Sequence, residues 1–221
     1  YNKISKKEKG GLFMSITATE FKTNLGKYLM LAATEDIFIS KNGKIIAKLT
    51  NPNQDRVDIA KSLFGSVPSG CTLEESDMIA LLDTCVIIDA LQKREPFCEN
   101  AQTIFLLSAN RLFDGWISAK SVTDIYYLTH RQTHSDAETR NILSRLFVLF
   151  DILDTAGLDC RQAISSNVSD YKDAVMIETA RRTGMDCIVT RNEKDYAHAD
   201  IPVYTPEAFI ALLSSEEETD F

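Results

Sequence analysis

Apolar positions along the first fifty residues change their period twice. Apolar side chains recur at helical spacing between Phe21 and Ala32, directly after Thr17-Ala18-Thr19-Glu20, a sequence typical of a helix N-terminal capping box. Two β-rich runs then flank Asn42-Gly43, a dipeptide that favours a tight hairpin turn because both turn positions need positive φ. Residues 14–50 are therefore predicted to form a small α+β module made of an extended piece, one helix and a hairpin.

From Met78 onward, short apolar runs alternate with stretches of helical periodicity. The predicted strands are 79–82, 115–118, 150–153, 187–189 and 202–204. Short apolar strands that alternate with helices form a parallel sheet covered by helices on both faces. The predicted fold class is therefore α/β, a parallel sheet sandwiched by helices over residues 78–213, preceded by the small α+β module.

Three other stretches lack a sustained pattern. Residues 1–13 are rich in Lys and Gly and are predicted to be a flexible tail, and residues 214–221 form an acidic tail. Residues 51–77 contain one short predicted helix at 58–64, followed by glycines and a proline that interrupt any further element. This segment has apolar residues without a core of its own, so we expect it to be a linker that docks on a surface of the same chain or of a second copy.

Composition excludes several classes of protein. The chain has 221 residues, 44% of them hydrophobic, which is enough to fill a core. Its five cysteines form no CxxC pair, and this scattered, odd set is typical of reduced thiols rather than of disulfides or a zinc site. No apolar run is long enough to span a bilayer, and no signal peptide is recognisable. We therefore expect a cytoplasmic protein that does not bind a membrane.

Charge is distributed unevenly along the chain. The formal net charge is -8, but residues 1–48 carry +5, residues 49–77 carry -3 and residues 78–221 carry -10. A basic head favours a nucleic-acid partner, and a strongly acidic body favours a cation. Ordinary surface variation is the simpler explanation for the basic head alone. The split indicates two functions on one chain.

Four aspartates are placed where parallel strands end. Asp83 follows the first strand, Asp124 lies on the helix after the second, and Asp195 follows the 187–189 strand, whose preceding helix begins near Asp173. Sites in open parallel sheets lie beyond the carboxyl ends of the strands. A lone aspartate at a helix start is more often an N-cap, so the joint placement of all four is what favours a site. An all-oxygen cluster suits Mg²⁺ or Mn²⁺, which implies metal-assisted hydrolysis of a phosphodiester.

Four stretches in this region resemble the PIN-domain nucleases, most of all the VapC-like toxins of bacterial toxin–antitoxin pairs. They are LLDTCVIIDAL at 81–91, ISAKSVTDIYYL at 117–128, SDYKDAVMIETARRTGMDCIVTRNEKDY at 169–196 and IPVYTPEAFIALL at 201–213. The resemblance implies a Mg²⁺-dependent endoribonuclease. It matches Asp83, Asp173 and Asp195 to family acids, places Asp124 where many members have Glu, and places Asn192 where others often have Asp.

The first module has its own resemblance. MSITATEFKTNLGKYL followed by DIFISKNGKIIAKL is similar to the Phd/YefM-type antitoxins, which dimerise, bind operator DNA and inhibit their toxin with a C-terminal tail. The resemblance implies DNA binding and dimerisation by residues 14–50 and toxin docking by residues 51–77. Candidate DNA contacts are Lys22, Asn24 and Lys27, for which a solvated helix face is the competing interpretation.

Together these patterns predict a toxin–antitoxin fusion: a PIN-type endoribonuclease acting on RNA, kept in check by an antitoxin-like segment, in a homodimer or higher homo-oligomer. The alternative function is a non-catalytic DNA-binding autoregulator with an inactive PIN domain. A haloacid-dehalogenase phosphatase would need Asp where Cys85 stands, and a receiver domain would need acids before Asp83. Two separate proteins, the second initiated at Met78, would give the same sequence.

Overall fold

The computed structural model describes residues 14–32, 36–50, 53–64, 77–197 and 199–215. The contacts between residues divide the chain into two compact units, residues 1–55 and residues 56–221. The predicted tail at 1–13, most of the acidic tail at 214–221 and the second half of the 51–77 segment lie outside the described residues. Each unit is described by itself below.

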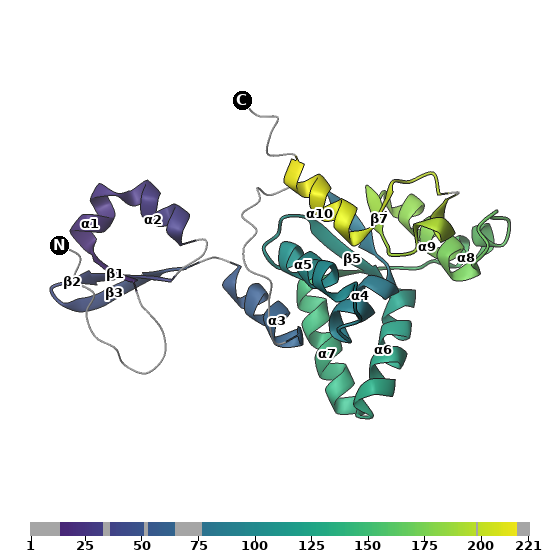
Figure 1. Cartoon of the computed structure of the whole chain (residues 1–221), viewed down its shortest axis with the longest axis horizontal. Helices are drawn as coiled ribbons and strands as arrows, with labels where there is room; N and C mark the ends of the chain where they lie inside the picture. The colour runs from purple at the N-terminus through teal and green to yellow at the C-terminus, as the bar shows by residue number, and fades with distance from the viewer. Residues whose placement is uncertain (1–13, 33–35, 51–52, 65–76, 198, 216–221) are drawn as a thin grey trace. The chain divides into compact units, whose positions relative to one another are not determined.

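The first unit is a three-stranded sheet with two short helices (Figure 1). Its elements are β1 (Met14–Thr17), α1 (Ala18–Thr23), α2 (Leu25–Leu31), β2 (Ile37–Lys41) and β3 (Lys44–Leu49). Strand β2 is central, parallel to β1 and antiparallel to β3. Asn42 and Gly43 both have positive φ, 52° and 78°, which confirms the predicted hairpin turn.

The single helix predicted in this unit is interrupted at Asn24. The Thr17 hydroxyl accepts a hydrogen bond from the Glu20 amide at 3.1 Å, as predicted for the cap, and the Glu20 carboxylate accepts one from the Tyr28 hydroxyl at 2.6 Å. Asn24 leaves helical geometry at φ -125° and ψ 39°, so the residues after it turn away from the predicted face. Tyr28 is buried, but Leu25 and Leu29 are 47% and 51% exposed.

The second unit is a five-stranded, all-parallel sheet in the order β6-β5-β4-β7-β8. Its elements are α3 (Gln54–Phe64, of which the first two residues belong to the first unit), β4 (Ile79–Leu82), α4 (Thr84–Leu91), α5 (Cys98–Ala109), β5 (Asp114–Ser118), α6 (Ala119–Thr133), α7 (Asp136–Leu149), β6 (Asp151–Leu153), α8 (Gly157–Ala163), α9 (Tyr171–Thr183), β7 (Cys187–Val189), the 3-10 helix η1 (Glu193–Tyr196), β8 (Val203–Tyr204) and α10 (Pro206–Ser215). The predicted α/β fold class is confirmed.

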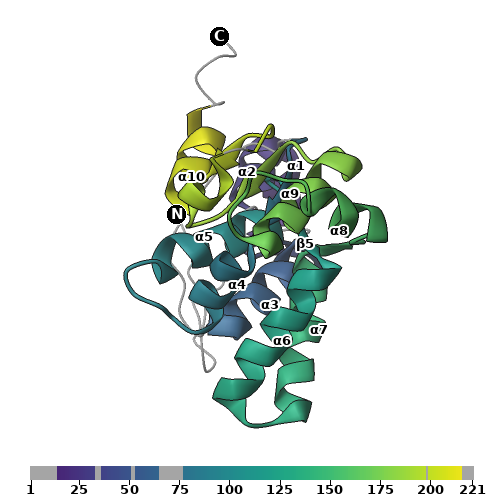
Figure 2. The same cartoon turned by 90° about the vertical axis from the view of Figure 1, so that its right-hand side faces the viewer.

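Both faces of this sheet are covered. Alternate strand residues point to opposite sides, so Ala80 and Leu82 enter a core with α4, α5 and α10, while Leu81 enters a second core with α9. Helices α8 and α9 gather at one side of the unit, away from α5, and α6 and α7 form an antiparallel pair (Figures 1 and 2). Among the described residues, no helix is both long and apolar enough to cross a membrane.

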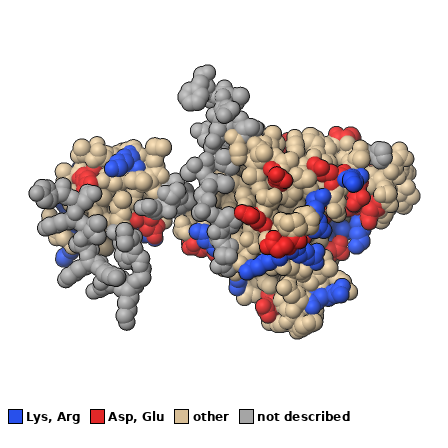
Figure 3. All heavy atoms as spheres, in the orientation of Figure 1, with Lys and Arg blue, Asp and Glu red and all other residues tan. Residues whose placement is uncertain are grey.

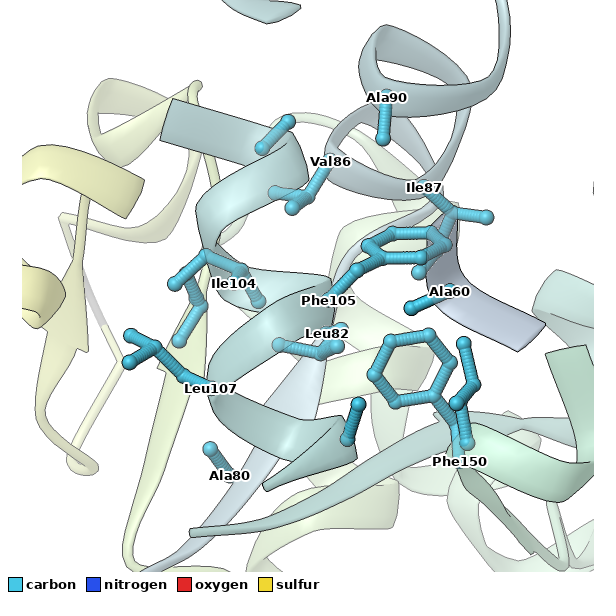
Figure 4. Packing of buried hydrophobic residues seen from close by; sticks show 14 of the residues in the cluster. Ala60, Ala80, Leu82, Val86, Ile87, Ala90, Ile104, Phe105, Leu107 and Phe150 are labelled. Carbon is cyan, nitrogen blue, oxygen red and sulfur yellow. The ribbon is translucent and has the colours of Figure 1, made fainter. Parts of the chain in front are cut away.

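Helix α3 is part of the larger core of the second unit. Ala60 is fully buried and Phe64 is 2% exposed. The Phe64 ring packs edge-on against Phe105, with centroids 5.7 Å apart, and Phe105 packs edge-on against Phe150. Figure 4 shows Ala60 beside Phe105 and Phe150. The helix begins four residues earlier than predicted, and the apolar face of this segment is covered by the same chain.

Arg56 holds the beginning of α3 in place. Its guanidinium donates hydrogen bonds to the carbonyl oxygens of Ser108 and Ala109 at the end of α5, at 3.2 and 3.4 Å, and of Leu149 at the end of α7, at 2.8 Å, and also to that of Val148. The last carbonyls of a helix have no partner within it and carry its partial negative charge. One cation therefore caps two helices, at the edge of the sheet where β5 and β6 begin.

Asp159 ties α8 to α9, the helix that carries Asp173. The Asp159 side chain is fully buried and accepts hydrogen bonds from Arg182 at 2.7 and 2.9 Å, from the Thr179 hydroxyl and from the Ala156 amide. Burial alone would raise the pKa of Asp159, but Arg182 and the hydrogen bonds outweigh it, so the pKa lies below its usual value. The carboxylate is therefore charged in the folded protein.

Replacing Asp159 with asparagine should lower the stability of the second unit at pH 7. The change leaves Arg182 without its charged partner, a loss of about 3 kcal/mol, or about 6–12 °C in Tm for a unit of this size. A carboxyl whose pKa is lowered on folding contributes stability above its unfolded pKa and loses it as the pH falls through the folded value. The difference in Tm should therefore shrink below about pH 4, near the unfolded pKa of an aspartate. Asp154→Asn, at an exposed neighbour, is the control; equal melting of both variants would contradict the role of this ion pair.

Candidate active site

Asp83 lies at the carboxyl end of β4 and precedes α4. Its backbone has N-cap geometry, but its side chain makes no capping hydrogen bond to α4. Instead Oδ2 accepts hydrogen bonds from the Thr190 hydroxyl at 2.7 Å and from the Cys85 thiol at 3.1 Å. Helix capping therefore does not account for this carboxylate, which is oriented by β7 and by the first turn of α4.

Asp173 lies in the first turn of α9 and faces Asp83. The N-cap of α9 is Asp170, which accepts a hydrogen bond from the Lys172 amide at 2.7 Å, so Asp173 is not needed for capping. Asp173 Oδ1 accepts a hydrogen bond from the buried Tyr196 hydroxyl at 3.2 Å. Burial and then the charges of Asp83 and Asp170 raise the pKa of Asp173 to about 6. The two carboxylates repel each other across the end of the sheet.

Cys85 is a structural thiol at this site. Burial and the neighbouring Asp83 raise its pKa to about 12, so it stays protonated and donates to Asp83. Its sulfur also accepts a hydrogen bond from the Arg191 amide at 3.4 Å. The same two causes, burial first, raise the pKa of Tyr196, which keeps that hydroxyl a donor to Asp173. Neither group is suited to be a nucleophile.

Arg191 fixes the loop that follows β7. Its Nη1 lies 3.0 Å from both carboxylate oxygens of Asp89, which is 1% exposed, and its guanidinium lies 4.6 Å from the centre of the Phe97 ring. Burial raises the pKa of Asp89, and the charges of Arg191 and Arg94 oppose that shift. The buried ion pair and the cation–π contact hold the backbone that positions Thr190 against Asp83.

Asp124 is engaged by two lysines. Its Oδ2 lies 2.7 Å from Lys120 Nζ, one turn earlier on α6, and 3.8 Å from Lys172 Nζ at the start of α9. The predicted carboxylate is therefore close to the site, but its charge is balanced by ammonium groups from two helices. Asp195 lies on η1, and its charge contributes to raising the pKa of Asp173. Asn192 precedes η1, and its backbone N–H donates a hydrogen bond to Thr190 Oγ1 at 3.1 Å.

The residues at this site could hold a cation through two carboxylates, those of Asp83 and Asp173. Among the described residues, no group of three or more His, Cys, Asp or Glu side chains lies close enough to hold one ion. Magnesium commonly binds proteins through one or two carboxylates and keeps several waters. The paired Asp83 and Asp173, with the raised pKa of Asp173, are the donors that suit such an ion.

In the first unit, the three predicted DNA contacts are exposed. Lys22 lies in the last turn of α1, Asn24 lies between α1 and α2, and Lys27 lies on α2 with its Nζ 5.6 Å from the centre of the Tyr28 ring. Their exposure is consistent both with contacts to DNA and with an ordinary solvated helix surface.

Several site residues were not singled out by the sequence. Thr190, Cys85 and Tyr196 orient the two acids, and Asp89 with Arg191 supports the loop. Asp89 carried a signal: an aspartate at the sixth position after Asp83 in an otherwise apolar helix needs a partner if it is buried.

Known proteins resemble the second unit. The profile of the family described as PIN domain matches residues 80–194. Among solved structures, a toxin–antitoxin complex from Klebsiella pneumoniae is 26% identical and covers 57% of this chain and 97% of its own, with a TM-score of 0.43. FitAcB from Neisseria gonorrhoeae is 21% identical over 58% of this chain and 99% of its own, with a TM-score of 0.45. VapBC2 from Rickettsia felis, bound to a promoter DNA fragment, is 16% identical over 57% and 97%, with a TM-score of 0.43. No curated protein matches the sequence.

Proposed function

Because the chain belongs to the PIN-domain family, we propose that its second unit is a Mg²⁺-dependent endoribonuclease. The observation that carries the proposal is the opposition of Asp83 and Asp173, two carboxylates from different elements, in which burial and then the charge of Asp83 raise the pKa of Asp173. Such a pair destabilises the folded protein unless a cation lies between them. Their orientation by Thr190 and Tyr196 supports a built site rather than a chance encounter.

In this proposal Asp83 and Asp173 hold the ion, and Asp124 and Asp195 act on it through water. The bound ion would activate water and stabilise charge that develops on an RNA phosphate, and Mn²⁺ has the same preference for oxygen ligands. Thr190 and Cys85 fix one oxygen of Asp83 by donating to it, which leaves the other oxygen for the ion. Tyr196 similarly restrains Asp173.

For the first unit we propose an antitoxin module of the Phd/YefM type that binds operator DNA through Lys22, Asn24 and Lys27. Two observations support it. The three candidate contacts are exposed. The unit also leaves large apolar side chains uncovered, which suits a second copy of the module: Leu25, Leu29, Met30, Ile45 and Ile46 are 47–81% exposed.

We further propose that the antitoxin-like N-terminal part of the chain, with residues 51–77 as its docking segment, restrains the nuclease. Helix α3 is the first helix of the second unit, and Arg56 binds it at the edge of the sheet opposite Asp83. Because α3 belongs to the core of the second unit, the truncation that tests this proposal removes residues 1–52 and leaves α3 in place, and it should increase RNA cleavage. The measurement is cleavage of a panel of transfer and messenger RNAs by the full chain and by residues 53–221, each with Mg²⁺ and with a chelator.

Three results of this assay decide between functions. Cleavage that needs Mg²⁺ and rises after the truncation is the expected result. Equal cleavage by both chains would contradict the restraint. Absence of cleavage by both, together with sequence-specific binding of operator DNA by the full chain, would contradict the nuclease and favour the non-catalytic autoregulator.

A further inference from the structure

The proposed site poses an electrostatic problem for its proposed substrate. The charges of Asp83, Asp170 and Asp195 all act on Asp173, and residues 78–221 carry a charge of -10. RNA is a chain of phosphates, and binding it depends on cationic side chains that replace its counterions. One metal ion between two carboxylates leaves the neighbouring phosphates without a partner. Cationic residues close to the acids are therefore required.

Arginines on α9 and on the loop after β7 are already committed to carboxylates other than the paired acids. Arg191 binds Asp89 and packs on Phe97, and Arg182 binds Asp159. Arg181 binds Glu178 and Asp200. On the face shown in Figure 3, basic and acidic side chains of the second unit lie next to one another rather than in one basic patch. Lysines close to the paired acids are then the cationic side chains to consider for attracting RNA phosphates.

Lys120 and Lys172 have the required placement. They come from different helices, α6 and α9, and both reach the same oxygen of Asp124. Lys172 directly precedes Asp173, and its side chain is 65% exposed, against 28% for Lys120. Two ammonium groups share one carboxylate, so the cluster has a net positive charge beside an acidic site. A lysine ammonium has three donors, which leaves some for a phosphate.

We infer that Lys120 and Lys172, gathered by Asp124, bind an RNA phosphate beside the paired acids. The inference rests on the proposed function and adds the residues that bind its substrate. Asp124 holds the two ammonium groups near each other before RNA arrives, which lowers the entropic cost of forming the contacts. The cluster also joins α6 to α9 through Asp124, so the bound phosphate would lie beside the first turn of α9, which carries Asp173.

The test measures binding of the full chain to a single-stranded RNA in Mg²⁺ over a series of salt concentrations, and a gel of the recovered RNA verifies that it stayed intact during each measurement. Lys120→Gln and Lys172→Gln should each reduce the slope of log Kd against log salt by about 0.7, equivalent to an increase of about fivefold in Kd at 0.1 M salt. Lys120→Arg and Lys172→Arg should keep most of the slope. Lys61→Gln, an exposed lysine on α3, is the matched control.

The first unit is a second candidate nucleic-acid surface, so the same variants are repeated in a chain with Lys22→Gln and Lys27→Gln. An unchanged slope and Kd in the Lys120→Gln, Lys172→Gln double variant would overturn the inference while the nuclease proposal stands. Lysine-dependent binding by a chain that cleaves no RNA would support the inference and overturn the nuclease. A wild-type chain that binds no RNA would overturn both.

Discussion

Replacing Phe64 with alanine should lower the Tm of the second unit by about 6–20 °C. The ring is 2% exposed and packs on Phe105, so truncating it opens a cavity in the core, at a cost of about 3–5 kcal/mol, with about 2–4 °C of Tm per kcal/mol for a unit of this size. Trp116 is the only tryptophan and lies on β5, so its fluorescence reports the melting of this unit alone.

Two further variants separate packing from hydrogen bonding. Arg56→Met keeps an apolar stem but removes the caps of α5 and α7, and it should cost about 2–3 kcal/mol, the value of hydrogen bonds from a charged donor. Lys61→Ala, on the exposed side of α3, should leave the Tm within about 2 °C, as surface substitutions do. If the Phe64→Ala variant had the same Tm as the Lys61→Ala control, α3 would not be part of the cooperatively folded core.

Replacing Asp83 or Asp173 with asparagine should abolish Mg²⁺-dependent cleavage of RNA and should also stabilise the metal-free protein. The loss of cleavage should be at least about 10²–10³-fold, the range for removing one group that stabilises charge in a transition state. The gain in stability follows from the repulsion between the two carboxylates, which an amide relieves. Opposite changes in activity and stability distinguish a site from a structural defect.

The decisive measurement is Tm with and without Mg²⁺. Wild type should gain stability from the ion, about 2.7 kcal/mol when Mg²⁺ is at 100 times its Kd, and the asparagine variants should gain much less. Glu193→Gln removes an exposed acid on η1 and should behave as wild type. If Asp83→Asn retains both cleavage and the Mg²⁺-induced rise in Tm, the assignment of these acids is wrong.

The order of elements was predictable because their periods are local properties of the sequence. All five strands of the parallel sheet and the Asn42-Gly43 turn were found from apolar spacing and turn chemistry. The two errors have different causes, a local backbone geometry for the first and distant contacts for the second. Asn24 breaks one predicted helix into two, and α3 begins at Gln54 rather than Asp58 because the hydrogen bonds of Arg56 to α5 and α7 extend it. No pattern within residues 51–64 encodes partners that lie some fifty and ninety residues away.

The candidate acids were predictable from strand order, but their surroundings were not. The end of a parallel strand identifies Asp83, and the start of the helix before the 187–189 strand identifies Asp173. The sequence could not show that Lys120 and Lys172 meet on Asp124, because this contact joins helices some fifty residues apart. For the same reason the roles of Thr190 and Tyr196 emerged only from the structure.

The position of α3 determines where the second unit can be separated from the residues that precede it. A polypeptide translated from Met78 would lack Arg56, Ala60 and Phe64, and it would expose the aromatic surface that they cover. Such a product would lack the packing that α3 contributes to the stability of the second unit. The core of the second unit therefore extends to residues that precede Met78, and a piece of the chain that begins at Met78 is incomplete as a folding unit.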